Sequence, residues 1–245
     1  MKRFLVGIAL VGLLASTAQA QLAVFPTWYN PAGSGVGIFA TYGAGLNDDS
    51  KYGTGTPSAF GGLVTVNAGV FKAWAGANYV NPNAGAAFDK EVTFGGNLGV
   101  GLYKQQAESP VMVDLMVGVG YAKFGVDTSA TGQITQLQFP IALPVAVAFE
   151  VSEGNTLAPW FAPGVQIFNT KVTDAAGDTS ETNIGIGVAG GLNFHSDMGL
   201  SLFVVGDWST ATIFGTKNKP FRFGAGIGYN FSVASFGDSK GLFGN

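Results

Sequence analysis

The sequence contains no cysteine, little charge and only one histidine. Without cysteine among its 245 residues, the chain has neither disulfide bonds nor a lipid anchor on a cysteine. Charged residues make up 11% and hydrophobic residues 47%, a poor match to the hydrated surface of a soluble domain. Beyond the first twenty residues no run of about 18 apolar residues occurs, which excludes transmembrane helices.

The first twenty residues have the form of a secretory signal. Two basic residues precede an apolar stretch over 4–15, and Ala18-Gln19-Ala20 has the small-x-small form of a signal peptidase site. Loss of the two basic residues changes the formal net charge from −3 to −5, so we expect no nucleic-acid partner. The expected organisation is a signal peptide at 1–20, a periplasmic N-terminal segment at 21–34, a barrel at 35–231 and a C-terminal tail at 232–245.

Apolar residues alternate with small or polar ones along much of the mature chain. The clearest stretch is 220–231, PFRFGAGIGYNF, in which Phe221, Phe223 and Ile227 alternate with Arg222 and glycines. A period of two indicates strands with one apolar face, and closure in a lipid bilayer is the structure that buries every backbone polar group. Ten strands are predicted, at 35–46, 58–67, 70–80, 91–103, 110–124, 134–151, 156–169, 183–194, 198–209 and 220–231.

The connections between these strands alternate in length. The first, third, fifth, seventh and ninth are long and polar, whereas the even-numbered ones are short. Bacterial barrels have short periplasmic turns and longer outer loops, so the alternation predicts an outer-membrane location with both termini in the periplasm. The long connections are 47–57, 81–90, 125–133, 170–182 and 210–219.

The alternation also assigns a direction to each side chain. On 70–80, Phe71 and Tyr79 are expected to face lipid near the two interfaces, whereas Lys72 and Trp74 face the lumen. On 91–103, the same period places Tyr103 on the lumen side.

Proline interrupts the pattern in two predicted strands. Pro140 and Pro144 fall in the sixth and Pro159 and Pro163 in the seventh, and each removes a donor from the strand ladder. We expect local bulges there or a pair that extends past the membrane. Without these two strands the count is eight, and twelve is the other alternative to ten. Phe243 in the tail is a candidate to close a further strand.

At this level the chain resembles small bacterial outer-membrane barrels, the class that includes the transmembrane domain of outer-membrane protein A. The resemblance rests on the signal peptide, the alternation of loop lengths and the run 224–231. This run looks like the last-strand signal read by the barrel-assembly machinery. In that class the signal usually ends the chain, whereas here 232–245 follows. The resemblance implies an all-β, closed, antiparallel up-and-down barrel whose partners are outer-membrane lipids, lipopolysaccharide and the assembly machinery; it identifies no extracellular partner.

The inward positions define the candidate lumen-lining residues. Charges inside a narrow barrel must pair or be hydrated, which leaves two interpretations. In one, Lys72 and Arg222 form salt bridges with the acids and plug the lumen. In the other, a narrow hydrated path favours cations because acids outnumber bases. The candidates are Lys72, Glu91, Asp114, Gln136, Gln138, Glu150, Gln166, Asp207 and Arg222.

No motif predicts catalysis, a cofactor or a metal site. The run 185–190, GIGVAG, matches a dinucleotide fingerprint as a string, but it lies inside one predicted strand instead of at a strand-to-helix turn. His195, Ser196 and Asp197 are adjacent, whereas catalytic triads are assembled from distant positions. The acids of the outer loops lack the spacing of a calcium loop.

The favoured function is therefore non-enzymatic, in envelope structure or surface interaction. The alternative is a small passive channel, weakly selective for cations, and a remote third is a lipid-modifying enzyme that uses Ser196 and His195. The role of 21–34 stays open, because Phe25, Trp28 and Tyr29 are suited either to plugging the periplasmic mouth or to anchoring at the interface.

Overall fold

The structure is a computed structural model that describes residues 29, 35–45, 58–81, 91–103, 110–126, 132–174, 177–213, 216–218 and 221–231. The predicted signal peptide, the tail at 232–245 and all of segment 21–34 except Tyr29 lie outside these residues. Within the described part, no helix has the length and apolar character needed to cross a membrane.

The described chain is built from antiparallel strands. The first half contains β1 (Gly35–Gly45), β2 (Ser58–Ala68), β3 (Phe71–Asn81), β4 (Glu91–Tyr103), β5 (Val111–Val126) and β6 (Gly132–Ala142). The second half contains β7 (Val145–Val147), β8 (Phe149–Ser152), β9 (Asn155–Asp174), β10 (Gly177–Ser196), β11 (Leu200–Ser209), β12 (Ala211–Ile213), β13 (Thr216–Asn218) and β14 (Phe221–Phe231).

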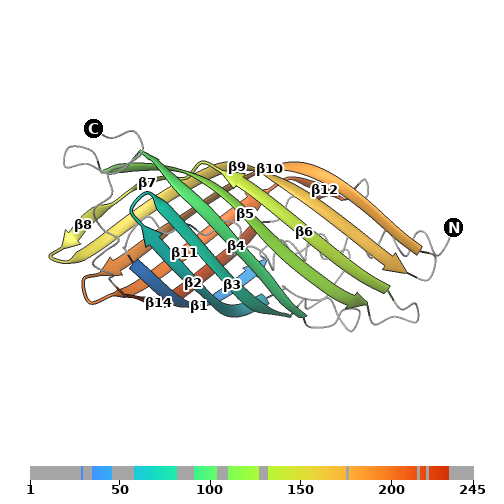
Figure 1. The fold of residues 1–245 in the computed structure, drawn as a ribbon, viewed down its shortest axis with the longest axis horizontal. Helices are drawn as coiled ribbons and strands as arrows, with labels where there is room; N and C mark the ends of the chain where they lie inside the picture. The colour runs from blue at the N-terminus through green and yellow to red at the C-terminus, as the bar shows by residue number, and fades with distance from the viewer. Residues whose placement is uncertain are drawn as a thin grey trace.

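The main sheet closes on itself. From β1 to β6 each strand pairs with the next along the chain, and β6 pairs with β9, β9 with β10, β10 with β11 and β11 with β14. β14 also pairs with β1, which closes the sheet, whereas β12 and β13 form a separate two-stranded sheet. β6, β7 and β8 share one position because all three pair with β9, so the barrel has ten positions and the predicted fold is confirmed. Figure 1 shows the strands inclined to the long axis, as closure requires.

The two ends of the barrel differ. One end, here called the turn end, carries the short reversals at Gly69, Gly154 and Gly199, and each of these glycines has a positive φ. The opposite end, the loop end, carries the connections from β1 to β2, from β3 to β4, from β5 to β6 and from β9 to β10. β1 begins and β14 ends at the turn end, which in bacterial barrels is the periplasmic end.

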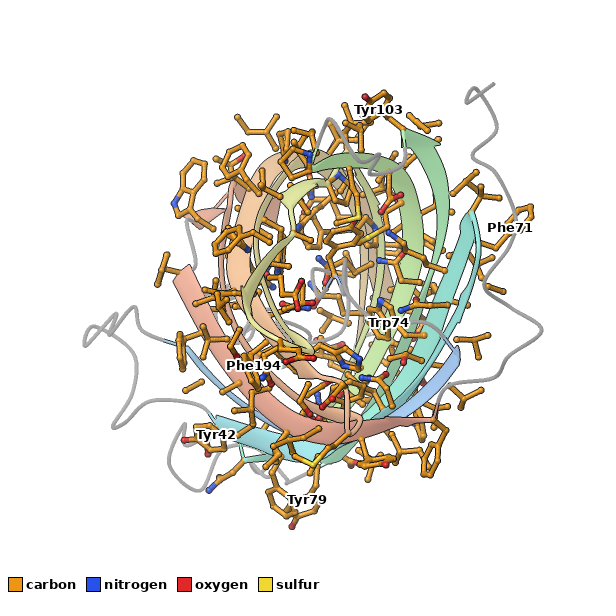
Figure 2. All side chains as sticks on the ribbon, turned by 90° about the vertical axis from the view of Figure 1, so that its left-hand side faces the viewer. Tyr42, Phe71, Trp74, Tyr79, Tyr103 and Phe194 are labelled. Carbon is orange, nitrogen blue, oxygen red and sulfur yellow. The ribbon has the colours of Figure 1, made fainter. Side chains whose placement is uncertain are left out.

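The predicted facing holds along most strands. On β3, Phe71 is 60% exposed and Tyr79 40%, whereas Trp74 is 7% exposed. Viewed along the barrel, Phe71 and Tyr79 lie on the outside and Trp74 lies inside (Figure 2). The prediction for Tyr103 is wrong, because the register between β4 and β5 shifts between Gly101 and Tyr103. The extra residue of this bulge turns Tyr103 to the outside, where it is 41% exposed.

The prolines act differently in the two strands. The predicted sixth strand is broken into β6, β7 and β8, with Pro144 in the first break. β9 continues through Pro159 and Pro163 without interruption. The carbonyl oxygens of these segments still accept hydrogen bonds, from Asp114 N to Pro144 and from Leu143 N to Pro163, so only donors are lost.

One predicted loop is wrong. Residues 170–182 were expected to be a long connection, but β9 continues to Asp174 and β10 begins at Gly177. The segment contains four threonines, which favour strands, and β9 also pairs with β6 up to Thr173. β9 and β10 therefore form a hairpin of 20 residues each that reaches beyond β3 and β4 at the loop end (Figure 1).

Inward glycines make room for large inward side chains. A Cβ at Gly226 would lie 2.5 Å from Phe203 Cζ, and one at Gly191 would lie 2.8 Å from Trp160 Cε2. The run 185–190 lies inside β10 without a turn, as predicted. The glycines of β10 and β14 are thus packing sites.

We expect Gly228→Ala to lower the free energy of unfolding by about 1–3 kcal/mol, the usual cost of overpacking. A Cβ there would press on the Ile38 carbonyl oxygen and lie 2.5 Å from Phe39 Cδ1, closer than Cβ atoms approach. Gly99→Ala is the matched control, since its nearest neighbours lie at 3.5 Å, an ordinary contact. Urea unfolding in lipid vesicles, followed by tryptophan fluorescence, measures both; equal stabilities would contradict the prediction.

Candidate functional site

The barrel interior at the turn end is built around Tyr29. This residue belongs to no strand, yet it is 2% exposed. Its hydroxyl donates to Asp114 Oδ2 on β5 and accepts from Lys72 Nζ on β3 at 3.0 Å. Lys72 Nζ also lies 2.5 Å from Asp114 Oδ2 and 4.8 Å from the centre of the Tyr29 ring. The phenol therefore sits inside a buried ion pair.

The opposite side of Tyr29 contacts β9 and β10. Its ring meets Trp160 edge-on, with 5.7 Å between ring centroids, and its backbone oxygen accepts from Asn193 Nδ2 at 2.9 Å. Asn193 Oδ1 in turn accepts from Trp160 Nε1 at 3.0 Å. Four strands therefore converge on one residue that precedes the barrel in sequence. Of the two roles left open for 21–34, Tyr29 supports plugging; Phe25 and Trp28 lie outside the described residues.

A second buried ion pair lies toward the loop end. Asp207 on β11 and Arg222 on β14 are direct register partners, and their side chains are 1% and 0% exposed. Arg222 Nη2 donates to Asp207 Oδ2 at 2.8 Å and Arg222 Nε donates to Oδ1. The contact is bidentate, the geometry in which guanidinium and carboxylate match best.

Amides occupy the wall formed by β6 and β9. Gln138 Nε2 donates to Gln166 Oε1 at 2.8 Å, and Gln136 Nε2 donates to Thr170 Oγ1 at 3.4 Å. The Oε1 atoms of Gln136 and Gln138 and the Thr93 hydroxyl are buried and have no protein partner. Such atoms are normally satisfied by internal water, so this half of the interior is suited to hydration.

The other two candidates lie apart from these groups. Glu91 is half-buried at the start of β4. Glu150 is exposed at the turn end, where its Oε1 accepts from Gly154 N at 2.9 Å. The ion-paired charges among the nine candidates are balanced, with Asp114 and Asp207 against Lys72 and Arg222, and half-buried Glu91 is a further acid.

His195 contacts Ser201 instead of its sequence neighbour Ser196. His195 Nδ1 lies 2.7 Å from Ser201 Oγ on β11, and the same oxygen accepts from Asn230 Nδ2 on β14 at 2.5 Å. Ser196 instead accepts from Leu200 N across the turn. The Ser201 hydroxyl therefore joins β10, β11 and β14 at the turn end. Because Ser201 is only 4% exposed, this hydroxyl is not accessible to large substrates.

Two small cavities lie among the described inward side chains. One cavity of about 10 Å³ lies beside Tyr29 and Trp74, and another of about 20 Å³ lies between Met116, Gln166 and Ala189. Each has room for about one water molecule. Across the described ranges, no three histidine or acidic side chains gather as metal ligands would.

The exterior, in contrast, is apolar. The outward residues of β4, β5 and β11 include Leu98, Val117 and Leu202, which are 63%, 44% and 41% exposed. Tyr42, Phe71, Tyr79 and Tyr103 lie on the outside in Figure 2. Phe71 and Tyr103 are at the turn end of their strands, and Tyr42 and Tyr79 are near the loop end. A closed barrel with this exterior is stable only in a bilayer, where aromatic girdles mark the interfaces. The chain is a transmembrane β-barrel of the outer-membrane class.

No protein-family model matches the sequence, and no curated protein matches it either. Solved structures with a similar fold are outer-membrane barrels. The N-terminal barrel domain of Pseudomonas aeruginosa OprF is 14% identical over 82% of this chain and 100% of that one, with a TM-score of 0.36. Neisserial surface protein A is 13% identical over 82% of this chain and 100% of that one, with a TM-score of 0.38. The outer-membrane protease OmpT of Escherichia coli is 10% identical over 81% of this chain and 94% of that one, with a TM-score of 0.40. Similarity this distant carries no functional assignment.

Four of the buried residues described above are not among the nine candidates: Trp160, Asn193, Ser201 and Asn230. All four occupy inward positions of the alternation. An inventory of every polar or aromatic inward residue, in place of the charged and glutamine residues alone, would have found them.

Proposed function

We propose that this protein is a closed, non-enzymatic outer-membrane barrel that acts at the cell surface through the projecting β9–β10 hairpin. The main evidence for this proposal is the length of the hairpin. A strand crosses a bilayer with about 9–11 residues, whereas β9 and β10 have 20 each. Crossing the membrane therefore requires only about half of each strand of the hairpin.

The outward face of the hairpin changes character along its length. Ile184 and Ile186, which are 73% and 60% exposed, give way toward the hairpin tip to Thr182, Ser180 and Asp178. On β9 the same change occurs between Ile167 and Asn169. The apolar part matches lipid, and the polar part matches the headgroup and outer aqueous region.

The polar part is internally cross-linked. Asn169 Nδ2 donates to Thr182 Oγ1 at 2.8 Å, and Lys171 Nζ lies 2.6 Å from Asp178 Oδ2. The hydrogen bond from Lys171 holds the pKa of the Asp178 carboxyl below its ordinary value, so the pair stays charged at neutral pH. A paired, rigid strand surface is already ordered before it meets a partner, which lowers the entropic cost of binding.

The proposed partner is lipopolysaccharide, whose sugars and phosphates lie at the height of this polar surface. The closed interior supports a surface role over transport, because Tyr29 and two ion pairs occupy the described lumen. Ser201 is buried, and Ser196 accepts from Leu200 N while His195 contacts Ser201; both observations support the non-enzymatic assignment.

Replacing 169–182 with an Asn-Gly turn tests the proposal. We expect the shortened protein to keep its heat-modifiable mobility, because the apolar part of the barrel is intact, and to lose retention on immobilised lipopolysaccharide. The matched control is K171A/D178A, which breaks the exposed ion pair alone and should lower retention much less. Full retention by the shortened protein would contradict the surface role. Steady conductance of the full-length mature protein in planar bilayers would contradict closure.

A further inference from the structure

The wall around Tyr29 is too small to fill the lumen by itself. Eight-stranded barrels are just wide enough for their own side chains to fill, and this barrel has ten positions. On β7, β9 and β10 the inward residues include Ala146, Ala158, Ala162 and Ala189. These alanines are at most 5% exposed, and the apolar cluster that covers them includes Tyr29. Closure at this level therefore depends on a residue from outside the sheet.

The two inward phenylalanine rings do not fill the space that Tyr29 occupies. Phe39 and Phe203 pack against each other, with 5.9 Å between centroids, over the glycines of β14. Atoms of Phe203 lie 2.5 Å from a Cβ position on Gly226, and atoms of Phe39 lie equally close to one on Gly228. Both rings are thus folded onto their own wall and leave the β7–β10 side to Tyr29.

Each recognisable feature of the phenol has a partner. The hydroxyl hydrogen is bound by Asp114 and a hydroxyl lone pair by Lys72. The Lys72 ammonium lies over the ring, and Trp160 meets the ring edge-on. Tyr29 takes part in no strand ladder, so its departure breaks none of the sheet's backbone hydrogen bonds.

We propose that Lys72, Asp114, Trp160 and Asn193 form a binding site for a hydroxy-aromatic group, with Tyr29 as its resident occupant, and that an ion path opens when the site is empty. The path would lead from this site past the two small cavities, which share Met116 in their linings, to the hydratable glutamine wall. Its buried charges are balanced, two acids against two bases, so ion selectivity should be weak.

Planar-bilayer recordings of the mature Tyr29→Ala protein test the proposal. We expect discrete conductance steps that the wild type lacks, and block of these steps by p-cresol. Toluene has the same ring without the hydroxyl, so it should block about tenfold less well, the loss typical of a missing hydrogen bond to a charged group. Tyr42→Ala is the matched control, because Tyr42 is 52% exposed on the lipid face of β1, and it should stay silent.

Silence from folded Tyr29→Ala protein, or equal block by p-cresol and toluene, would overturn the inference. If Tyr29→Ala does not fold, Tyr29→Phe is the second test, because it keeps the ring and loses both hydroxyl contacts. We expect brief channel openings from this variant, and their absence would overturn the inference. The two proposals fail separately. Wild-type conductance contradicts the closed barrel, whereas a silent wild type with a silent, folded variant contradicts only the latent path.

Discussion

Arg222→Met should destabilise the barrel by about 3–5 kcal/mol, the cost of leaving a buried carboxylate without its ion-pair partner. Arg222 and Asp207 are each 3% exposed or less, and their bidentate contact joins β11 to β14. Methionine has a similar length and adds no clash, so the loss isolates the charge. Urea unfolding of the protein in lipid vesicles, with unfolding read by tryptophan fluorescence, measures the free-energy difference.

The double variant R222M/D207L is the control. It removes both charges, and replacing a buried pair with apolar residues is often neutral, so most of the lost stability should return. Equal destabilisation by the single and double variants would show that packing, not charge, dominates at this position. Asp207→Leu alone should resemble Arg222→Met, since it leaves the guanidinium buried without this carboxylate.

Leu98→Lys should cost about 2–4 kcal/mol, the penalty for a lysine on the lipid face near the bilayer midplane. Leu98 lies near the middle of β4 and is 63% exposed in a chain whose exterior at that level is apolar. In water the same exposure would make the substitution nearly neutral. The size of the loss therefore measures whether this surface contacts hydrocarbon.

Thr179→Lys is the matched control, because Thr179 is exposed on the hairpin part of β10 that projects beyond the apolar band. We expect a change within about 0.5 kcal/mol there, as for other exposed surface sites. The same vesicle unfolding assay serves for both variants, and shorter-chain lipids should reduce the Leu98→Lys penalty by bringing water closer. A neutral Leu98→Lys would contradict the assignment of the lipid face.

The local pattern of the sequence determined the strands and the direction of most side chains. A period of two over each segment sends Phe71 out and Trp74 in without reference to any neighbour, because consecutive side chains of a strand point to opposite faces. The pattern failed where a neighbour intervenes. Tyr103 turned outward because of a bulge against β5, and 170–182 became strand because β6 and β9 continue to pair there.

The interior contacts were decided by the tertiary structure. The sequence predicted that Lys72 and Arg222 would face inward with several acids, but not which acid each would meet. Register joins Asp207 to Arg222 across β11 and β14, whereas Lys72 on β3 and Asp114 on β5 meet across the intervening strand β4, beside Tyr29. Tyr29 belongs to no strand, so no periodicity predicts its position. Its burial follows from the space that inward alanines and glycines leave in a ten-position barrel, which exists only once the sheet has closed.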